Sequence, residues 1–157
     1  MARVLVCPNG RPLKIDAATS ARLGRIRQKG TVPERVVRKL VSAISARYTL
    51  ENRDLPGSPD LANRTRAWAI FVHGCFWHSH RGCVRATIPK RNRDFWLAKF
   101  EANRNRDKRA ISRLRRFGFT VVLIWECEAE LRPDGVRRLL ARSLPSVARQ
   151  IRGKRDA

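Results

Sequence analysis

An α/β fold, with a small mixed β-sheet flanked by helices, is predicted by two observations on this sequence of 157 residues. The first is a pair of short apolar runs, residues 66–72 (RAWAIFV) and 119–125 (FTVVLIW), which predict buried strands, the second of them central in the sheet. The second is apolar spacing typical of helices over residues 33–47 and 132–151, with a long charged helix expected between the strands over residues 91–117. Helices and strands in this order predict layers of helix on sheet.

The remaining segments are expected to frame this core. Residues 1–30 are basic and interrupted by Pro and Gly, which predicts an N-terminal arm with one short helix over residues 17–28. Thr31 is expected to cap the first core helix, and a short strand is expected near residues 48–50. We therefore expect a basic arm followed by a single domain over residues 31–157.

Charge is the most unusual feature of the composition. The chain has 35 Lys and Arg against 13 Asp and Glu, a formal net charge of +22, and 28 of the 35 cations are Arg. Arg binds phosphate through two parallel hydrogen bonds, and cations that line phosphates release condensed counterions, so nucleic acid is the expected partner. Codon bias in a GC-rich genome is an alternative reason for Arg over Lys, but it does not account for the scarcity of acids.

Two further features bear on location. No apolar run reaches the roughly 18 residues that a transmembrane helix needs, and the start of the chain lacks the apolar stretch of a secretory signal. We therefore expect a cytoplasmic protein without membrane contact. We also expect it to be monomeric and associated with the nucleoid. In a reducing compartment, the 4 Cys residues predict metal binding or thiol chemistry before disulfides.

The stretch HGCFWHSHRGC, which follows the first apolar strand, contains all 3 His residues of the chain and two of its 4 Cys residues. Cys75, His80 and Cys83 have the compact spacing C-x4-H-x2-C, and thiolate and imidazole donors suit tetrahedral Zn²⁺. A closed structural site needs a fourth ligand, and Cys127, just beyond the second apolar strand, is favoured over Cys7 in the arm. The alternative is a set of small buried Cys residues beside a surface His.

The other two His residues are available for catalysis. His73 follows the first apolar strand, His78 lies five residues further on, and Asp60 stands before that strand. Metal-dependent nucleases hold hydrated Mg²⁺ near a phosphate in this way, with an acid such as Asp60 as ligand and a neutral His as proton acceptor. For Asp60 alone, a turn residue after proline is the better interpretation. With two unassigned His residues and a polyanionic partner, a nuclease is favoured.

Aromatic residues lie among these polar ones and suggest how DNA would be read. Phe76 and Trp77 lie inside the proposed metal loop, a rigid mount for apolar side chains that separate stacked bases; core packing is the alternative. Spacing of i, i+3, i+7 and i+10 on the long helix places four residues on one stripe: Trp96, Lys99, Asn103 and Arg106. These residue types suit stacking, phosphate and base-edge contacts, although a solvated helix face is the simpler alternative for any one of them.

Five stretches of the sequence resemble the very-short-patch-repair (Vsr) endonuclease family, in the family's order and across residues 19–128. They are TSARLGRIRQKGTVPE, DLPGSPD, IFVHGCFWHSHRGC, RNRDFWLAKFEANRNRD and GFTVVLIWECE. The resemblance implies a restriction-endonuclease-like core of the PD-(D/E)xK type. It also implies a nickase that cuts one DNA strand 5′ of the thymine in T:G mismatches, which arise when 5-methylcytosine deaminates, and so starts very short patch repair.

The resemblance also implies roles for residues of the matching motifs. Asp60, helped by the backbone carbonyl of Val72, would bind Mg²⁺. His78 would be the general base and His73 a second catalytic histidine near the scissile phosphate, while Glu34 would act on His78 or on the attacking water. The sequence departs from the usual nuclease pattern in one respect, since Phe-Val-His stands where an acid-x-lysine motif is expected.

The metal and DNA contacts implied by the resemblance agree with the choices made from spacing. Cys75, His80, Cys83 and Cys127 would hold a structural Zn²⁺. Phe76, Trp77 and Trp96 would form a wedge beside the mismatch, with Lys99 and Asn103 near the mispaired bases and Arg106 on the same stripe. Leu23 in the arm would probe the opposite groove.

The partners implied are double-stranded DNA with a mismatch, and functional links to a cytosine-5 DNA methyltransferase and to general mismatch-repair proteins. Two alternatives stay open. One is a nickase of this type that acts on another mismatch or sequence context, or in defence against foreign DNA. The other is a zinc-containing DNA-binding module without chemistry, which would not require Asp60, His73, His78 or Glu34.

Overall fold

A computed structural model describes residues 29–44 and 47–144, together with residues 17, 20–21 and 25. Most of the predicted arm helix therefore lies outside the described residues, as do the predicted probe Leu23, the alternative ligand Cys7 and the end of the last predicted helix.

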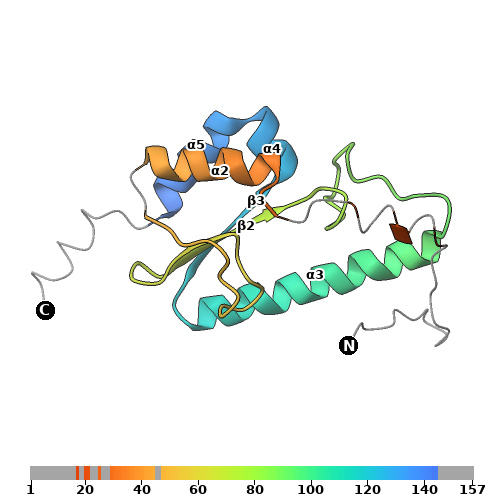
Figure 1. Ribbon diagram of the computed structural model, residues 1–157, viewed down its shortest axis with the longest axis horizontal. Coiled ribbons are helices and arrows are strands. Elements are labelled where there is room, and N and C mark those ends of the chain that lie inside the picture. The colour runs from red at the N-terminus through yellow and green to blue at the C-terminus, as the bar shows by residue number, and fades with distance from the viewer. Residues whose placement is uncertain (1–16, 18–19, 22–24, 26–28, 45–46, 145–157) are drawn as a thin grey trace, which may run out of the picture.

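Seven elements form the described domain, and they give the mixed sheet with flanking helices that the sequence predicts (Figure 1). They are α2 (Val32–Ala43), β1 (Leu61–Asn63), β2 (Trp68–His73), α3 (Arg93–Arg116), β3 (Thr120–Trp125), α4 (Glu126–Leu131) and α5 (Pro133–Ser143).

The sheet has three strands in the order β1-β2-β3, of which β1 and β2 are antiparallel and β2 and β3 are parallel. The prediction that residues 119–125 form the central strand was wrong, because β2 is central in the described sheet and β3 lies at its edge. The strand expected near residues 48–50 was wrong, because Thr49 makes only one isolated bridge, to Ala62. Glu51, two residues further on, adopts a left-handed backbone at φ 55°, which ends the extended conformation there. The strand that pairs with β2 at the other edge of the sheet is β1, which has only three residues and was too short to be predicted.

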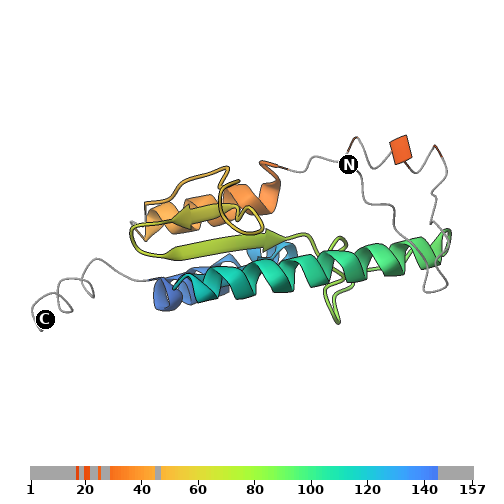
Figure 2. The same cartoon turned by 90° about the horizontal axis from the view of Figure 1, so that it is seen from below.

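Helices cover both faces of this sheet, as the two views of the chain show (Figures 1 and 2). Successive side chains of a strand point to opposite faces. Trp68 and Ile70 of β2 therefore join a core with α2, α4 and α5, whereas Ala69 and Phe71 pack against α3. Full burial of each large apolar side chain stabilises the fold by about 1.5–3 kcal/mol, so this alternation fixes the register of β2.

The long helix α3 continues past the sheet, beside the loop that follows β2 (Figure 1). One stripe of α3 is buried and mostly apolar: Phe95, Trp96, Phe100, Asn103, Ala110 and Leu114. The rest of its surface is dense in Arg and Lys. Within the described ranges, no helix is both long enough and apolar enough to cross a membrane.

A short helix, α4, intervenes where the sequence predicted a direct passage from strand to final helix. It begins at Glu126, immediately after β3, and the Glu128 carboxylate accepts a hydrogen bond of 3.0 Å from the Trp125 N–H. Pro133 then starts α5. Proline suits this position because the N–H groups of a first helical turn have no partner within the helix, so the N–H that proline lacks is not missed. The extra turn places Cys127 beside the carboxyl end of the sheet.

Candidate active site and metal centre

His73 is the last residue of β2, and the alternation of the strand determines where its side chain lies. It is two residues beyond Phe71 and so faces α3, where it is buried with 6% exposure. Its partner across the parallel ladder is Trp125, whose ring meets the imidazole edge-on at a centroid distance of 5.6 Å. The strand end thus holds His73 rigidly at the edge of the sheet.

The loop after β2 brings a second imidazole onto His73. The N–H of His78 donates to the carbonyl of Gly74 at 3.2 Å, which coils the loop back towards the strand. The His73 and His78 rings stack with centroids 3.8 Å apart and an angle of 11° between their planes. The two histidines that the sequence assigned to catalysis therefore lie in direct contact.

An acid from α3 completes this group, and the sequence interpretation gave it no role. Asp107 Oδ2 is in hydrogen-bond contact with His78 Nδ1 and lies 4.0 Å from His73 Nε2. The three side chains are close enough to form a group of potential metal ligands, although their contacts also suit proton transfer. One signal was available, since Asp107 lies four residues beyond Asn103 and continues the stripe as an acid within a run of cations.

The surroundings of His73 determine its charge. Burial, followed by repulsion from His78, lowers the pKa of His73 to about 4, even though the Asp107 carboxylate acts in the opposite direction. His73 is therefore neutral near neutral pH. A neutral ring beside a polyanion can donate a hydrogen bond but does not attract phosphate by its charge.

Asp60 lies on the other side of β2 from this group, in the chain leading into β1. The backbone N–H of Val72 donates to Asp60 Oδ2 at 2.7 Å. The buried side chain of Asn52 donates to the Pro59 carbonyl at 3.0 Å and fixes the residue before Asp60. Burial, reinforced by the nearby Glu34 carboxylate, raises the pKa of Asp60 to about 6.

Glu34, for which a catalytic role is predicted, makes structural contacts at the start of α2. It is 5% exposed at the start of α2 and accepts hydrogen bonds from Gly30 N at 2.8 Å and from Thr31 Oγ1 at 2.9 Å. Arg38 pairs with it at 3.2 Å from the next turn of the helix. Thr31 is the N-cap residue, as predicted, but its hydroxyl bonds the Glu34 carboxylate in place of a backbone N–H.

Two neighbouring hollows contain three of the four predicted catalytic residues, and His73 lines a third hollow beside α3. A cavity of about 530 Å³ is lined by Glu34, Val72 and His78, and also by the α3 residues Lys99 and Asn103. Asp60 lines an adjoining hollow of about 580 Å³, which shares Glu34. The structure therefore brings together the strand end, the loop histidine and the α3 stripe in one cavity, with Asp60 next to it.

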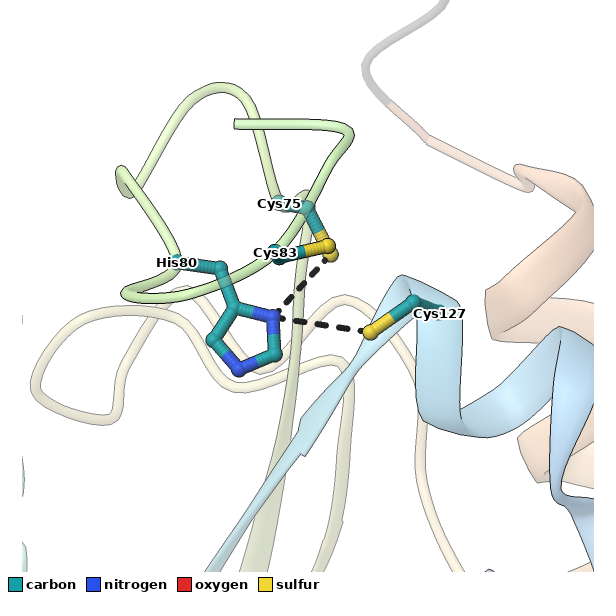
Figure 3. A group of neighbouring side chains, drawn as sticks. All are labelled: Cys75, His80, Cys83 and Cys127. Atoms are coloured by element: carbon teal, nitrogen blue, oxygen red, sulfur yellow. Dashed lines mark hydrogen bonds between the residues drawn. The ribbon is translucent and has the colours of Figure 1, made fainter. Parts of the chain in front are cut away.

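The four predicted metal ligands also lie together, at the other side of the same loop (Figure 3). His80 Nδ1 is 3.4 Å from Cys75 Sγ and 3.5 Å from Cys127 Sγ, and Cys83 Sγ completes the group, with all donor atoms within 4.8 Å of one another. Burial raises the pKa of the Cys75 thiol to about 12. This group of four donors is a candidate metal centre.

Carboxyl ends of parallel strands explain why Cys127 joins this group. β2 and β3 are parallel, so their ends meet at one edge of the sheet, where Cys75 follows β2 and Cys127 lies in the first turn of α4. A backbone hydrogen bond of 2.9 Å from His80 N to the Cys75 carbonyl folds the loop over them. Cys127 was predicted to lie near Cys75 because the two strands that precede them were expected to end side by side.

A salt-bridged group, absent from the sequence interpretation, ties the loop to α4. Glu126 Oε2 accepts a hydrogen bond of 3.0 Å from the backbone N–H of Cys75. Arg85, beyond the loop, contacts Glu126 Oε1 at 3.3 Å and Glu130 Oε2 at 2.7 Å. These contacts hold the loop to α4 at both of its ends.

Phe76 and Trp77, predicted to probe the DNA, pack together with α3. The Phe76 ring lies 5.1 Å from Trp96 and 5.3 Å from Phe100, edge to face, and Trp77 lies 6.2 Å from Trp96. Trp96 is only 2% exposed, whereas Phe76 and Trp77 are half-buried. The loop side chains are thus the accessible part of an aromatic cluster anchored on the helix.

The polar residues of the α3 stripe also make contacts within the protein. Asn103 is 8% exposed, and its side-chain amide donates to the Trp77 carbonyl at 2.8 Å. Its carbonyl oxygen accepts a hydrogen bond of 3.0 Å from Arg106. Asn103 therefore holds the Trp77 backbone, and its predicted contact with mispaired bases stays a prediction.

Comparison with known proteins identifies the class to which this site belongs. The family model described as DNA mismatch endonuclease Vsr matches residues 15–85. The type II nicking enzyme V.XorIIP of Xanthomonas oryzae pv. oryzae is 45% identical over 104 residues, which cover 66% of this chain and 76% of that protein. The type II nicking enzyme V.NmeAIP of Neisseria meningitidis is 39% identical over 104 residues, 66% and 74% of the two chains.

A third relative, the DNA mismatch endonuclease Vsr of Escherichia coli, is 36% identical over 113 residues, which cover 71% of this chain and 72% of that enzyme. With these matches, the chain is a DNA endonuclease. It belongs to the Vsr family of DNA mismatch endonucleases, as the sequence motifs predicted.

Proposed function

We propose that this endonuclease is a Mg²⁺-dependent nickase that cuts one strand 5′ of the thymine in T:G mismatches and so starts very short patch repair. The observation that carries the proposal is the contact of the His78 and Asp107 side chains at the end of β2. A carboxylate at Nδ1 favours the tautomer that has its proton there, which leaves Nε2 of His78 free to accept a proton from the attacking water.

Asp107 acts as a positioning residue in this scheme. Its carboxylate orients the His78 ring and stabilises the positive charge that the ring acquires when it takes up the proton. His73, stacked on His78 and kept neutral by burial, is suited to donating a hydrogen bond to the scissile phosphate. Glu34 lines the same cavity and would act on His78 or on the water.

Asp60 and the carbonyl of Val72 would hold Mg²⁺. The buried carboxyl of Asp60, with its raised pKa and the Glu34 carboxylate nearby, fits such an ion because a cation would offset both the burial cost and the repulsion. When bound, Mg²⁺ would supply positive charge against the charge that develops on the phosphate. The protein would belong to the PD-(D/E)xK type, with Pro59-Asp60 as its first motif and histidine in place of the usual acid-x-lysine motif.

Zn²⁺ is the ion that fits the Cys75, His80, Cys83 and Cys127 group. Bond lengths of about 2.3 Å to sulfur and 2.0 Å to nitrogen, at a tetrahedral angle, put the two donor atoms about 3.5 Å apart. The 3.4 and 3.5 Å separations of His80 Nδ1 from two of the sulfur atoms agree with that value. We propose a closed structural site, because four protein donors leave no position for substrate.

DNA recognition would use the aromatic cluster and the cavity beside it. Phe76 and Trp77, with Trp96 behind them, would enter the stack beside the mismatch, where unstacking is cheaper than at a matched step. Lys99, Asn103 and Arg106 would lie near the mispaired bases and their phosphates. Leu23 of the arm would contact the opposite groove. We expect a monomer to bind the duplex.

A second candidate function is nicking in another mismatch or sequence context. It is favoured by the names of the relatives, because two that share 45% and 39% identity with this chain are type II nicking enzymes, whereas the mismatch endonuclease Vsr shares 36%. The first function implies a cytosine-5 DNA methyltransferase, which supplies the methylated base whose deamination gives the mismatch, and cooperation with general mismatch repair. A role in defence belongs to the second candidate.

A panel of duplexes tests the proposal directly. Each of the mismatches, in several sequence contexts and with matched duplexes as controls, is incubated with the purified protein and Mg²⁺, and the cleaved strand and position are mapped. We expect one nick, 5′ of the thymine, in T:G duplexes alone. Equal cutting of matched DNA would rule out mismatch specificity, and cutting at a different mismatch would select the second candidate.

A further inference from the structure

A hollow of about 1100 Å³ lies beside α3, and apart from His73, His78 and Asp107 the residues that line it have no role in the proposed mechanism. Leu123 and Trp125 of β3 form part of its floor, together with Ile111 of α3. These strand residues face the same side as Phe71 and His73, where α3 packs, and both are only half-buried.

Cations surround this apolar floor. Five basic residues line the hollow: Arg81, Arg104, Lys108, Arg115 and Arg116. All five are exposed, and among the described residues no acid pairs with any of them. Asp107 is the one acid of the lining, and its carboxylate is already engaged by His78. The α3 groove, as we name this hollow, is therefore an unneutralised positive surface.

The groove meets the candidate active site. His73, His78 and Asp107 belong to its lining, and His78 also lines the smaller cavity on the other flank of α3. From Asp107 the basic residues continue along the helix through Lys108, and the eight helical steps from Asp107 to Arg115 span about 12 Å. This distance corresponds to about three to four nucleotide steps of a strand at 3.4 Å per step.

We propose that the α3 groove is a second DNA-contact surface, which holds the phosphates next to the scissile one, so that α3 has DNA contacts on both flanks. The partner follows from charge, because a row of unpaired cations leading away from the catalytic histidines matches the phosphates that must continue from the scissile bond. An apolar floor beneath the cations strengthens each contact with phosphate, since water is partly excluded. This inference rests on the proposed function, which places the scissile phosphate at His73 and His78.

Salt dependence of DNA binding tests the inference. The full chain, with its metal and without added Mg²⁺, is titrated with a T:G duplex and a matched duplex over a range of salt concentrations. Arg104→Gln, Lys108→Gln and Arg115→Gln each remove one cation from the groove. The slope of log Kobs against log salt should become shallower by about 0.9 for each phosphate that the protein no longer neutralises, and by the sum in the triple variant.

The matched controls are Arg138→Gln and Arg142→Gln, which remove the same charge from exposed positions of α5 on the opposite face of the sheet. Their slopes should equal that of the wild type. Equal slopes for the triple variant and the wild type would overturn the inference, as would equal changes of slope in the groove and control variants. Binding of polyglutamate that depends on the three groove residues, with DNA binding unchanged, would assign the groove to an acidic protein segment instead.

The binding measurement separates this inference from the proposed function. If no duplex is nicked but the groove variants still flatten the salt slope, the proposed function fails and the DNA surface stands. If T:G duplexes are nicked and the slope is unchanged, only the groove assignment fails. The DNA length provides a further readout, because shortening the duplex on one side of the nick should weaken binding by the wild type more than binding by the triple variant.

Discussion

Two groups of side chains arise from the same short stretch of sequence, yet they are suited to different tasks. Cys75, His80 and Cys83 turn towards Cys127 of α4, whereas His73 and His78 turn towards α3. The two sets alternate along the chain, so position in the sequence does not separate them. The last member of the candidate metal centre, Cys127, comes from α4, whereas the last member of the candidate catalytic group, Asp107, comes from α3. The helix that supplies this last side chain therefore distinguishes the two groups.

Trp125 lies between the two groups and contacts both. Its ring stacks on His80 with a centroid distance of 4.0 Å and an interplanar angle of 3°, and its edge meets His73 at 5.6 Å. Trp125, a residue type common in protein cores, thus lies between the candidate metal centre and the two histidines with a proposed catalytic role. The loop is therefore a single unit in which a proposed metal ligand and a proposed catalytic base are two residues apart.

The largest expected effect of any change to this unit is that of Cys127→Ser. Loss of one of four donors should release the bound ion and with it the order of the loop, so nicking and cooperative unfolding should both be lost. Metal analysis should give about one zinc per wild-type chain and little in the variant, with thermal unfolding followed by circular dichroism. Cys7→Ser is the matched control and should keep the metal; an unchanged zinc content in Cys127→Ser would remove that residue from the site.

Two neighbouring histidines should give opposite results if the two groups have the proposed tasks. His78→Ala removes the proposed base, so nicking should fall by about 10²–10⁴-fold while DNA binding, zinc content and unfolding stay close to those of the wild type. His80→Ala should instead release zinc and destabilise the fold. Single-turnover nicking and metal analysis of the two variants distinguish these outcomes, and full activity in His78→Ala would exclude it as the base.

Sequence patterns were sufficient for the elements whose local signal is strong. Two apolar runs predicted β2 and β3, and the length of α3 followed from its spacing. β1 and α4 were missed because three residues and six residues are too short to show a period. The strand expected at 48–50 was wrong because a pattern of residue types does not reveal the left-handed backbone at Glu51.

The candidate site was predictable only where its members are close in sequence. Cys75, His80 and Cys83 are recognisable by their spacing. Asp107 and Glu126 are not, because each acquires its partner from the packing of a helix against the loop, at sequence separations of 29 and 51 residues. The whole buried stripe of α3 determines which flank of the helix faces the sheet. No local sequence motif predicts this orientation.

A smaller effect, on stability, is expected at Asp60. Its folded pKa of about 6 lies above the unfolded value of 3.8, so the folded protein binds the proton more tightly, and stability decreases as pH rises from about 4 to about 6. Asp60→Asn removes this cost, since an amide oxygen can still accept from Val72 N–H. Without added Mg²⁺ the variant should be more stable at neutral pH by up to about 3 kcal/mol, and no more stable at pH below about 4.

Urea unfolding at the two pH values measures this difference, and nicking assays accompany it. The variant should be inactive, and wild-type nicking should decline as pH falls through about 6, because protonation removes the proposed Mg²⁺ ligand. A variant that is less stable than the wild type at neutral pH would show that the ionised Asp60 is stabilised by its neighbours in the folded protein. Retained nicking would remove Asp60 from the mechanism.

The smallest expected effect is that of Arg85→Met, which cuts the ion pairs that close the loop but leaves every proposed ligand and catalytic group in place. Arg85 is about one-third exposed, so its pairs with Glu126 and Glu130 should contribute little to the free energy of unfolding. Because Glu126 also accepts a hydrogen bond from the Cys75 N–H, the change should affect both the candidate metal centre and the proposed catalytic histidines. Zinc release by a chelator should become faster and single-turnover nicking slower in the same variant. Arg137→Met, which removes a solvent-exposed pair with Asp134 on α5, is the control and should change neither. A variant in which only one of the two rates changes would mean that the metal centre and the catalytic pair are held independently.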